Sequence, residues 1–87
     1  MVVTADHSHT FVMGGYPKRG NPIFGLAGSS LGKDGKKWTT LGYMNGPGAK
    51  TSGVRDDPSS VDTKARDYKQ QSLVPLSSET HGGEDVG

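Results

Sequence analysis

Three histidines and one aspartate are the residues of this sequence best suited to chemistry. Asp6, His7 and His9 fall within one short stretch near the start, and His81 lies near the end. The chain has no cysteine, so a metal would be bound through imidazole and carboxylate groups. These donors suit Zn²⁺, which takes nitrogen and oxygen ligands at about 2.0–2.2 Å. The competing interpretation is a plain polar loop, because the spacing lacks a tight pattern such as His-Glu-x-x-His.

Other kinds of site find less support in the sequence. No glycine pair is followed by Lys-Ser/Thr at the spacing of a phosphate loop, and no serine lies in a Gly-x-Ser-x-Gly motif. Basic residues are scattered among acidic ones and the net charge is only +1, so we expect no nucleic-acid-binding surface. No apolar run approaches the roughly 20 residues of a membrane span.

Short strands separated by turns are expected to position these residues. The apolar and β-branched runs that predict strands are residues 2–5, 10–13, 23–26, 37–43 and 73–76. Asp34-Gly35 predicts a hairpin with a long connection between the third and fourth runs. Pro75 places the last run at a sheet edge. Residues 61–71 contain enough helix formers for about two helical turns, with Asp62 as the N-cap.

The composition argues against a large core of the chain's own. Only 30% of the residues are hydrophobic, and Gly numbers 14. Such a chain buries little apolar surface to offset the entropy lost on ordering. We therefore expect a loop-rich segment that orders against a larger body. Because residues 2–5 start within a strand and Val86 stands where another could start, we expect both ends to continue into further structure.

Four separated motifs, in the same order along the chain, resemble the alkaline phosphatase family. Residues 4–9, Thr-Ala-Asp-His-Ser-His, are similar to the motif that ends a strand of its central sheet. Residues 14–27 resemble the segment that follows in animal-type members, and residues 43–48 resemble its Tyr-Gly-Asn-Gly-Pro-Gly. Residues 70–86 resemble the return of the chain to the core.

The resemblance implies an α/β parent fold, with helices on both faces of a sheet. Within it, this chain would be mostly loops and short β-strands of the crown, a small β-rich insert near the two-fold axis of a homodimer, with one short helix. Residues 1–15 would form a core strand and zinc-ligand loop, residues 16–78 the crown, and residues 79–87 the return to the core with the zinc ligand His81.

The implied activity is hydrolysis of phosphate monoesters at two Zn²⁺ and one Mg²⁺, through a phosphoserine. Asp6 and His7 match ligands of the zinc that activates the serine, and His81 matches a ligand of the other zinc. His9 matches a histidine that lies behind this second zinc without binding it. Tyr16 matches a tyrosine that reaches across the dimer towards the partner's active site.

The same resemblance leaves catalysis incomplete in these 87 residues. The nucleophilic serine, the phosphate-binding arginine and the remaining zinc and magnesium ligands have no match here and are expected upstream of Met1. We therefore predict that the chain alone is inactive. The parent is expected to be extracellular, at the cell surface with or without a lipid anchor, or periplasmic.

Two further interpretations remain open. One is an isolated crown that serves as a dimerisation or partner-binding module, with contact to the extracellular matrix as one such role. The other is a freestanding zinc protein built on His7, His9 and His81, which would have to close a loop of roughly 70 residues with little core to hold it.

Overall fold

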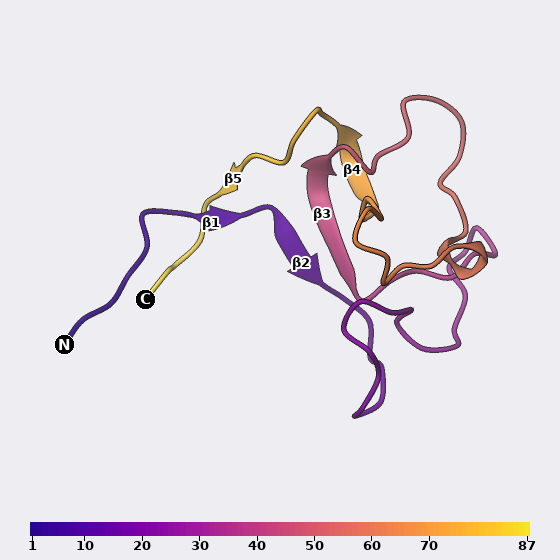
Figure 1. The fold of residues 1–87 in the computed structure, drawn as a ribbon, viewed down its shortest axis with the longest axis horizontal. Helices are drawn as coiled ribbons and strands as arrows, with labels where there is room; N and C mark the ends of the chain where they lie inside the picture. Colours follow the sequence, from indigo (N-terminus) through magenta and orange to yellow (C-terminus); the bar gives the residue numbers. More distant parts are fainter.

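The computed structural model describes residues 1–87 as short strands joined by long loops (Figure 1). The elements, in chain order, are β1 (Ser8–His9), β2 (Phe11–Met13), β3 (Leu41–Gly46), the 3₁₀ turn η1 (Pro58–Ser60), β4 (Ser72–Pro75) and β5 (His81–Gly82). They form a three-stranded sheet in the order β2-β3-β4 and a two-stranded sheet of β1 and β5. The expectation of loops and short β-strands is therefore confirmed. No helix has the length and apolar character needed to cross a bilayer.

The three-stranded sheet joins β2, β3 and β4. β2 pairs antiparallel with β3, which places Phe11 opposite Tyr43, and their rings meet edge to face with centroids 5.6 Å apart. Aromatic cross-strand pairs of this kind stabilise a sheet beyond the area they bury. β4 runs parallel to β3 along its other side and carries Pro75 at the sheet edge, where its missing N–H removes no ladder bond. The predicted edge position of Pro75 is confirmed.

A long hairpin precedes β3. Leu26 and Thr39 form an antiparallel bridge, and the Ala27 N–H donates to the Trp38 carbonyl at 2.8 Å. Gly35 turns the chain with a positive φ of 74°, a conformation that glycine adopts without steric cost. The predicted hairpin is thus present. The strand expected at residues 23–26 contributes only this one bridge.

The buried core is small, as the composition led us to expect. Only eight of the 87 residues are buried, and the buried hydrophobic residues are Ala27 and Leu41. Pro58 has the largest fully buried side chain. Many large apolar side chains are instead exposed, among them Val2 and Leu73.

The helix predicted at residues 61–71 does not form. Asp62 accepts a hydrogen bond from the Lys64 N–H, as a cap would, but the backbone then closes two turns, Ala65 N–H to the Asp62 carbonyl and Tyr68 N–H to the Ala65 carbonyl. The buried Thr63 hydroxyl donates to the carbonyl of Phe24 at 2.7 Å. This tertiary bond ties the first turn to an earlier loop. The local bond between the Asp62 side chain and the Lys64 N–H also competes with helix propagation.

The strand expected at residues 2–5 is also absent. Val2 and Val3 are exposed and pair with no other strand. A β-branched run needs a neighbouring strand to satisfy its backbone groups, and these 87 residues supply none at that place.

The β1–β5 pair joins the two ends of the sequence. Ser8 lies opposite Gly82 and His9 lies opposite His81 in antiparallel register. Figure 1 shows this pair beside both termini, with the three-stranded sheet and the long loops beyond it. The two ends of the segment between β1 and β5 therefore lie next to each other.

Candidate functional site

The β1–β5 pair brings all three histidines into one cluster. The His7 and His81 rings are stacked, with centroids 3.5 Å apart and 10° between their planes. The His9 ring stands nearly perpendicular to both, at 82°, with its centroid 5.6 Å from that of His7 and 6.3 Å from that of His81. Sequence alone placed these residues at opposite ends of the chain, and the fold makes them neighbours.

Asp6 and His7 face each other with geometry that suits a shared cation. The Asp6 Oδ1 lies 3.7 Å from the His7 Nε2. Two ligands of a tetrahedral zinc at about 2.0–2.1 Å would stand about 3.3 Å apart, so a small closure would let both bind one ion. The His7 Nδ1 lies 2.8 Å from the Ser8 carbonyl. Because a carbonyl only accepts, Nδ1 carries the proton and Nε2 is left with its lone pair.

These residues have the right donor chemistry for zinc without completing a site. Imidazole nitrogens and a carboxylate are its usual ligands. However, no three His, Asp or Glu side chains converge on one point. The stacked rings of His7 and His81 lie parallel, whereas two ligands of one ion would converge on it. The geometry therefore fits two partial sites better than one shared site.

Glu79 organises the side of the cluster behind His9, and the sequence analysis did not single it out. Its Oε1 lies 2.6 Å from the His9 Nδ1, and its Oε2 accepts from the Thr10 N–H and hydroxyl, each at 3.1 Å. The hydrogen bond from His9, then the one from the Thr10 amide, holds the pKa of the Glu79 carboxyl below its ordinary value. A lone glutamate before Thr-His carries no sequence signal strong enough to identify this role.

Asn45 is a second residue that sequence reasoning missed. Its Oδ1 accepts from the Thr80 N–H at 2.9 Å, and its Nδ2 donates to the Thr80 hydroxyl at 3.0 Å. Asn45 belongs to β3, so this bond pair ties the three-stranded sheet to the residue next to His81. The sequence analysis included it only within residues 43–48, one of the four motifs that carry the family resemblance, and gave it no role of its own.

Tyr16 lies outside the histidine cluster. Its side chain is fully exposed, and its hydroxyl makes no hydrogen bond in the chain. Its predicted role across a dimer stays a prediction.

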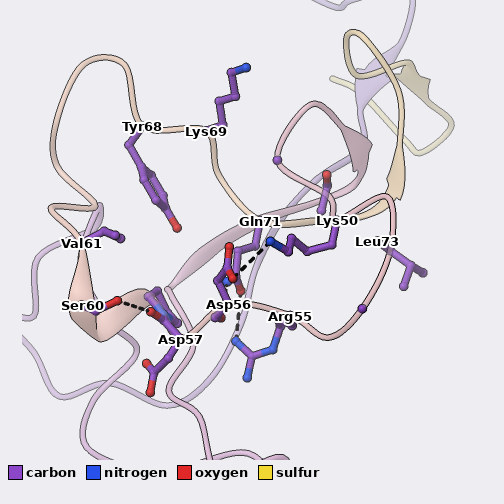
Figure 2. A pocket seen from close by; sticks show the side chains of 14 residues that line it. Lys50, Arg55, Asp56, Asp57, Ser60, Val61, Tyr68, Lys69, Gln71 and Leu73 are labelled. Atoms are coloured by element: carbon purple, nitrogen blue, oxygen red, sulfur yellow. Dashed lines mark hydrogen bonds and ion pairs between the residues drawn. The ribbon is translucent and has the colours of Figure 1, made fainter.

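A groove of about 490 Å³ lies elsewhere, lined by side chains from residues 48–73 (Figure 2). Three of its charged groups already have partners: Lys50 lies 3.4 Å from Asp56, and the Arg55 guanidinium donates to the Gln71 side chain at 3.0 Å. None of the histidines lines it. The groove therefore offers no continuation of the candidate site.

Comparison with known proteins identifies the family of the chain. The family model for alkaline phosphatase matches residues 1–87. Over 86 residues, the chain is 56% identical to the tissue-nonspecific alkaline phosphatase of Gallus gallus and 57% identical to an alkaline phosphatase of Gadus morhua. It is 56% identical to the tissue-nonspecific isozyme of Homo sapiens. Each match covers 98% of this chain.

The chain spans only a small part of these relatives: 17% of the Gallus gallus protein, 18% of the Gadus morhua protein and 16% of the human one. The match nevertheless runs along nearly the whole of this chain, through both histidine-bearing segments and the loops between them. The chain belongs to the alkaline phosphatase family.

Proposed function

We propose that this chain supplies metal ligands to the active site of a metal-dependent phosphomonoesterase. The observation that carries the proposal is the stacking of His7 on His81, which the β1–β5 pair brings about. Membership of the alkaline phosphatase family supports the reaction class. The substrates are phosphate monoesters, and the reaction passes through a phosphoserine whose serine lies outside these 87 residues.

Asp6 and His7 hold one zinc in this proposal, and His81 holds a second. The 3.7 Å separation of the Asp6 and His7 donor atoms supports their sharing one ion. The parallel rings of His7 and His81 support their serving different ions. Paired zinc ions, when bound, stabilise both the entering and the leaving oxygen of an in-line displacement at phosphorus. A magnesium ion takes its ligands from outside these residues.

Residues 16–78 form the crown insert in this proposal, between core segments 1–15 and 79–87. Support comes from β1 and β5, which pair directly and so give the intervening segment one point of departure and return. Tyr16 and the rest of the crown lie at the contact between two subunits of a homodimer. The full exposure of Tyr16 supports a position at such a contact.

The test uses a chimera in which residues 1–87 replace the matching segment of the Gallus gallus relative. We expect this chimera to hydrolyse p-nitrophenyl phosphate in a zinc-dependent manner. The 87-residue chain alone, with Zn²⁺ and Mg²⁺ added, should show no turnover. An inactive but folded chimera, or zinc-dependent turnover by the chain alone, would show that the proposed division of the active site is wrong.

A second candidate is a partner-binding or dimerisation module formed by the crown. One face of the three-stranded sheet favours it, because Val12, Met44 and Leu73 lie exposed there on neighbouring strands. Sedimentation of the isolated chain tests this candidate. A concentration-dependent dimer that is lost in Leu73→Asp would support it, and a monomer at all concentrations would exclude self-association as its role.

A further inference from the structure

The carboxylate of Glu79 receives hydrogen bonds from His9, at the end of β1, and from Thr10, the residue that joins β1 to β2. Oε1 lies 2.6 Å from the His9 Nδ1, while Oε2 takes the backbone N–H and the hydroxyl of Thr10. The Glu79 side chain is 25% exposed, against 60% for His9. A partly buried carboxylate with three donors is held in one orientation and can hold its donors in turn.

This arrangement sets the tautomer of His9. A carboxylate with two occupied oxygens acts only as an acceptor, so the His9 Nδ1 must carry a proton. The Nε2 is then the ring's remaining site for contact with another group. The ring plane stands at 82° to both His7 and His81, and its centroid lies 5.6 Å and 6.3 Å from theirs, so the His9 ring stands beside the stacked pair.

Asn45 fixes the backbone segment that carries Glu79. Its amide holds both the N–H and the hydroxyl of Thr80, the residue between Glu79 and His81. Asn45 also lies 3.4 Å from the Thr10 hydroxyl through its Oδ1. Thr10 and the Glu79–Thr80 segment are therefore joined to β3 and to each other in one network.

We propose that Glu79 is a positioning residue, which holds the His9 imidazole beside the His7–His81 pair with Nδ1 protonated. This inference rests on the proposed function, since it gives His9 its place beside the metal ligands. Glu79 itself touches neither metal nor substrate; it acts through His9.

The substitution Glu79→Gln tests this role because it keeps the shape of the side chain and halves its acceptors. A glutamine has one acceptor oxygen, while its NH₂ group only donates. If the oxygen stays with Thr10, the NH₂ faces the His9 Nδ1 and favours the opposite tautomer. If the oxygen turns to His9, the Thr10 donors lose their partner. Either arrangement disturbs the hydrogen bonds that Glu79 forms with His9 and Thr10.

A double-mutant cycle in the chimera separates an effect through His9 from a general loss of structure. The four proteins are the parent chimera, Glu79→Gln, His9→Ala and the double variant, each assayed for kcat on p-nitrophenyl phosphate and for bound zinc. Because the cycle compares one substitution in two backgrounds, a loss of stability common to both cancels. Ser78→Ala, an exposed neighbour without hydrogen bonds of its own, is the matched control.

We expect Glu79→Gln to lower kcat about tenfold in the parent, within the range found for outer partners of metal-site residues. In the His9→Ala background its effect should fall below about twofold, and Ser78→Ala should match the parent. An equal loss in both backgrounds, or no loss in either, would overturn the inference while leaving the proposed function intact. An inactive parent chimera would instead overturn the proposed function, and this inference with it.

Discussion

The imidazole rings of His7 and His81 lie face to face, 3.5 Å apart, although they come from opposite ends of the chain. The strand pair β1–β5 brings them together through the facing residues Ser8 and Gly82. At Gly82 the backbones of β1 and β5 approach so closely that an added Cβ would lie nearer to the His9 carbonyl than van der Waals contact allows. The histidine cluster therefore depends on a glycine at this position.

Gly82→Ala is expected to separate the histidines. The added methyl would push against backbone atoms of His9, which cannot move aside as a flexible side chain could. Overpacking of this kind typically costs about 1–3 kcal/mol. In the chimera we expect a lower melting temperature, weaker zinc binding and a loss of activity, measured by calorimetry, metal analysis and p-nitrophenyl phosphate hydrolysis.

Gly83→Ala is the matched control, because a Cβ there meets no atom within 4 Å. It should leave melting temperature and activity close to those of the parent. If Gly82→Ala behaved like Gly83→Ala, the close approach of β1 and β5 could not be what positions the cluster.

The two zinc ions of the proposal predict separable losses of metal. His7→Ala should remove one zinc from the chimera and His81→Ala the other, so the double variant should lose both. Each single variant should lower kcat/KM by at least about 100-fold, since even partners of the ligands contribute 10- to 100-fold. Metal analysis after dialysis, together with kinetics, provides the measurement.

Non-additivity is part of this expectation. An active site whose residues act as one unit loses most of its activity when any one of them is removed. The double variant should therefore be little slower than either single variant. Loss of the same single zinc in both variants would instead indicate a site shared by His7 and His81, contrary to the parallel stacking of their rings.

The sequence predicted local features well and long-range partners poorly. The strands at Phe11–Met13 and Ser72–Pro75 and the hairpin around Gly35 follow from side-chain alternation and turn chemistry, which act over a few residues. The prediction of a helix at residues 61–71 was wrong, because a tertiary hydrogen bond from Thr63 to Phe24 outweighs a weak local helix propensity.

The candidate site shows the same division. The motif around Asp6 and His7 was visible from residue types, and resemblance joined it to His81. Glu79 and Asn45 could not be found, because their roles depend on bonds to Thr10 and Thr80 across the fold. A carboxylate or an amide in a polar turn looks the same in sequence whether or not it is bonded to a distant element.

Arg55 is predicted to hold together the loops before and after β3. Its guanidinium binds both carboxylate oxygens of Asp34 at 2.8–3.1 Å and donates to the carbonyl of Lys37 and the side chain of Gln71. Because Arg55 is about one-third exposed, solvent weakens these bonds, and we expect Arg55→Ala to destabilise the chimera by about 1–2 kcal/mol. Urea unfolding measures the change.

Arg55→Lys should recover only part of this loss, since an ammonium cannot form the two-pronged pair with a carboxylate. Arg66→Ala is the control, because Arg66 is exposed and forms no ion pair. Equal midpoints for Arg55→Ala and Arg66→Ala would show that the network around Arg55 contributes nothing to stability.

Tyr68 is predicted to make the fold of the loops between β3 and β4 sensitive to strongly alkaline solution. Burial, and then the negative charge of Asp56, raise the pKa of the Tyr68 phenol above its ordinary value of 10.0. A group whose pKa is higher in the folded state favours folding in its protonated form. Its contribution to stability is therefore complete below the unfolded pKa and is lost as pH rises through the folded pKa.

The measurement is tyrosinate absorbance during an alkaline titration, taken as the difference between the parent chimera and Tyr68→Phe. The difference should appear above about pH 10, the ordinary pKa of tyrosine. Asp56→Asn should move it to lower pH, because it removes the nearby negative charge that opposes ionisation. Tyr68→Phe should also retain its fold to higher pH than the parent. A Tyr68 titration at or below the ordinary value, unaffected by Asp56→Asn, would mean that the phenol is solvated rather than held in the groove of Figure 2.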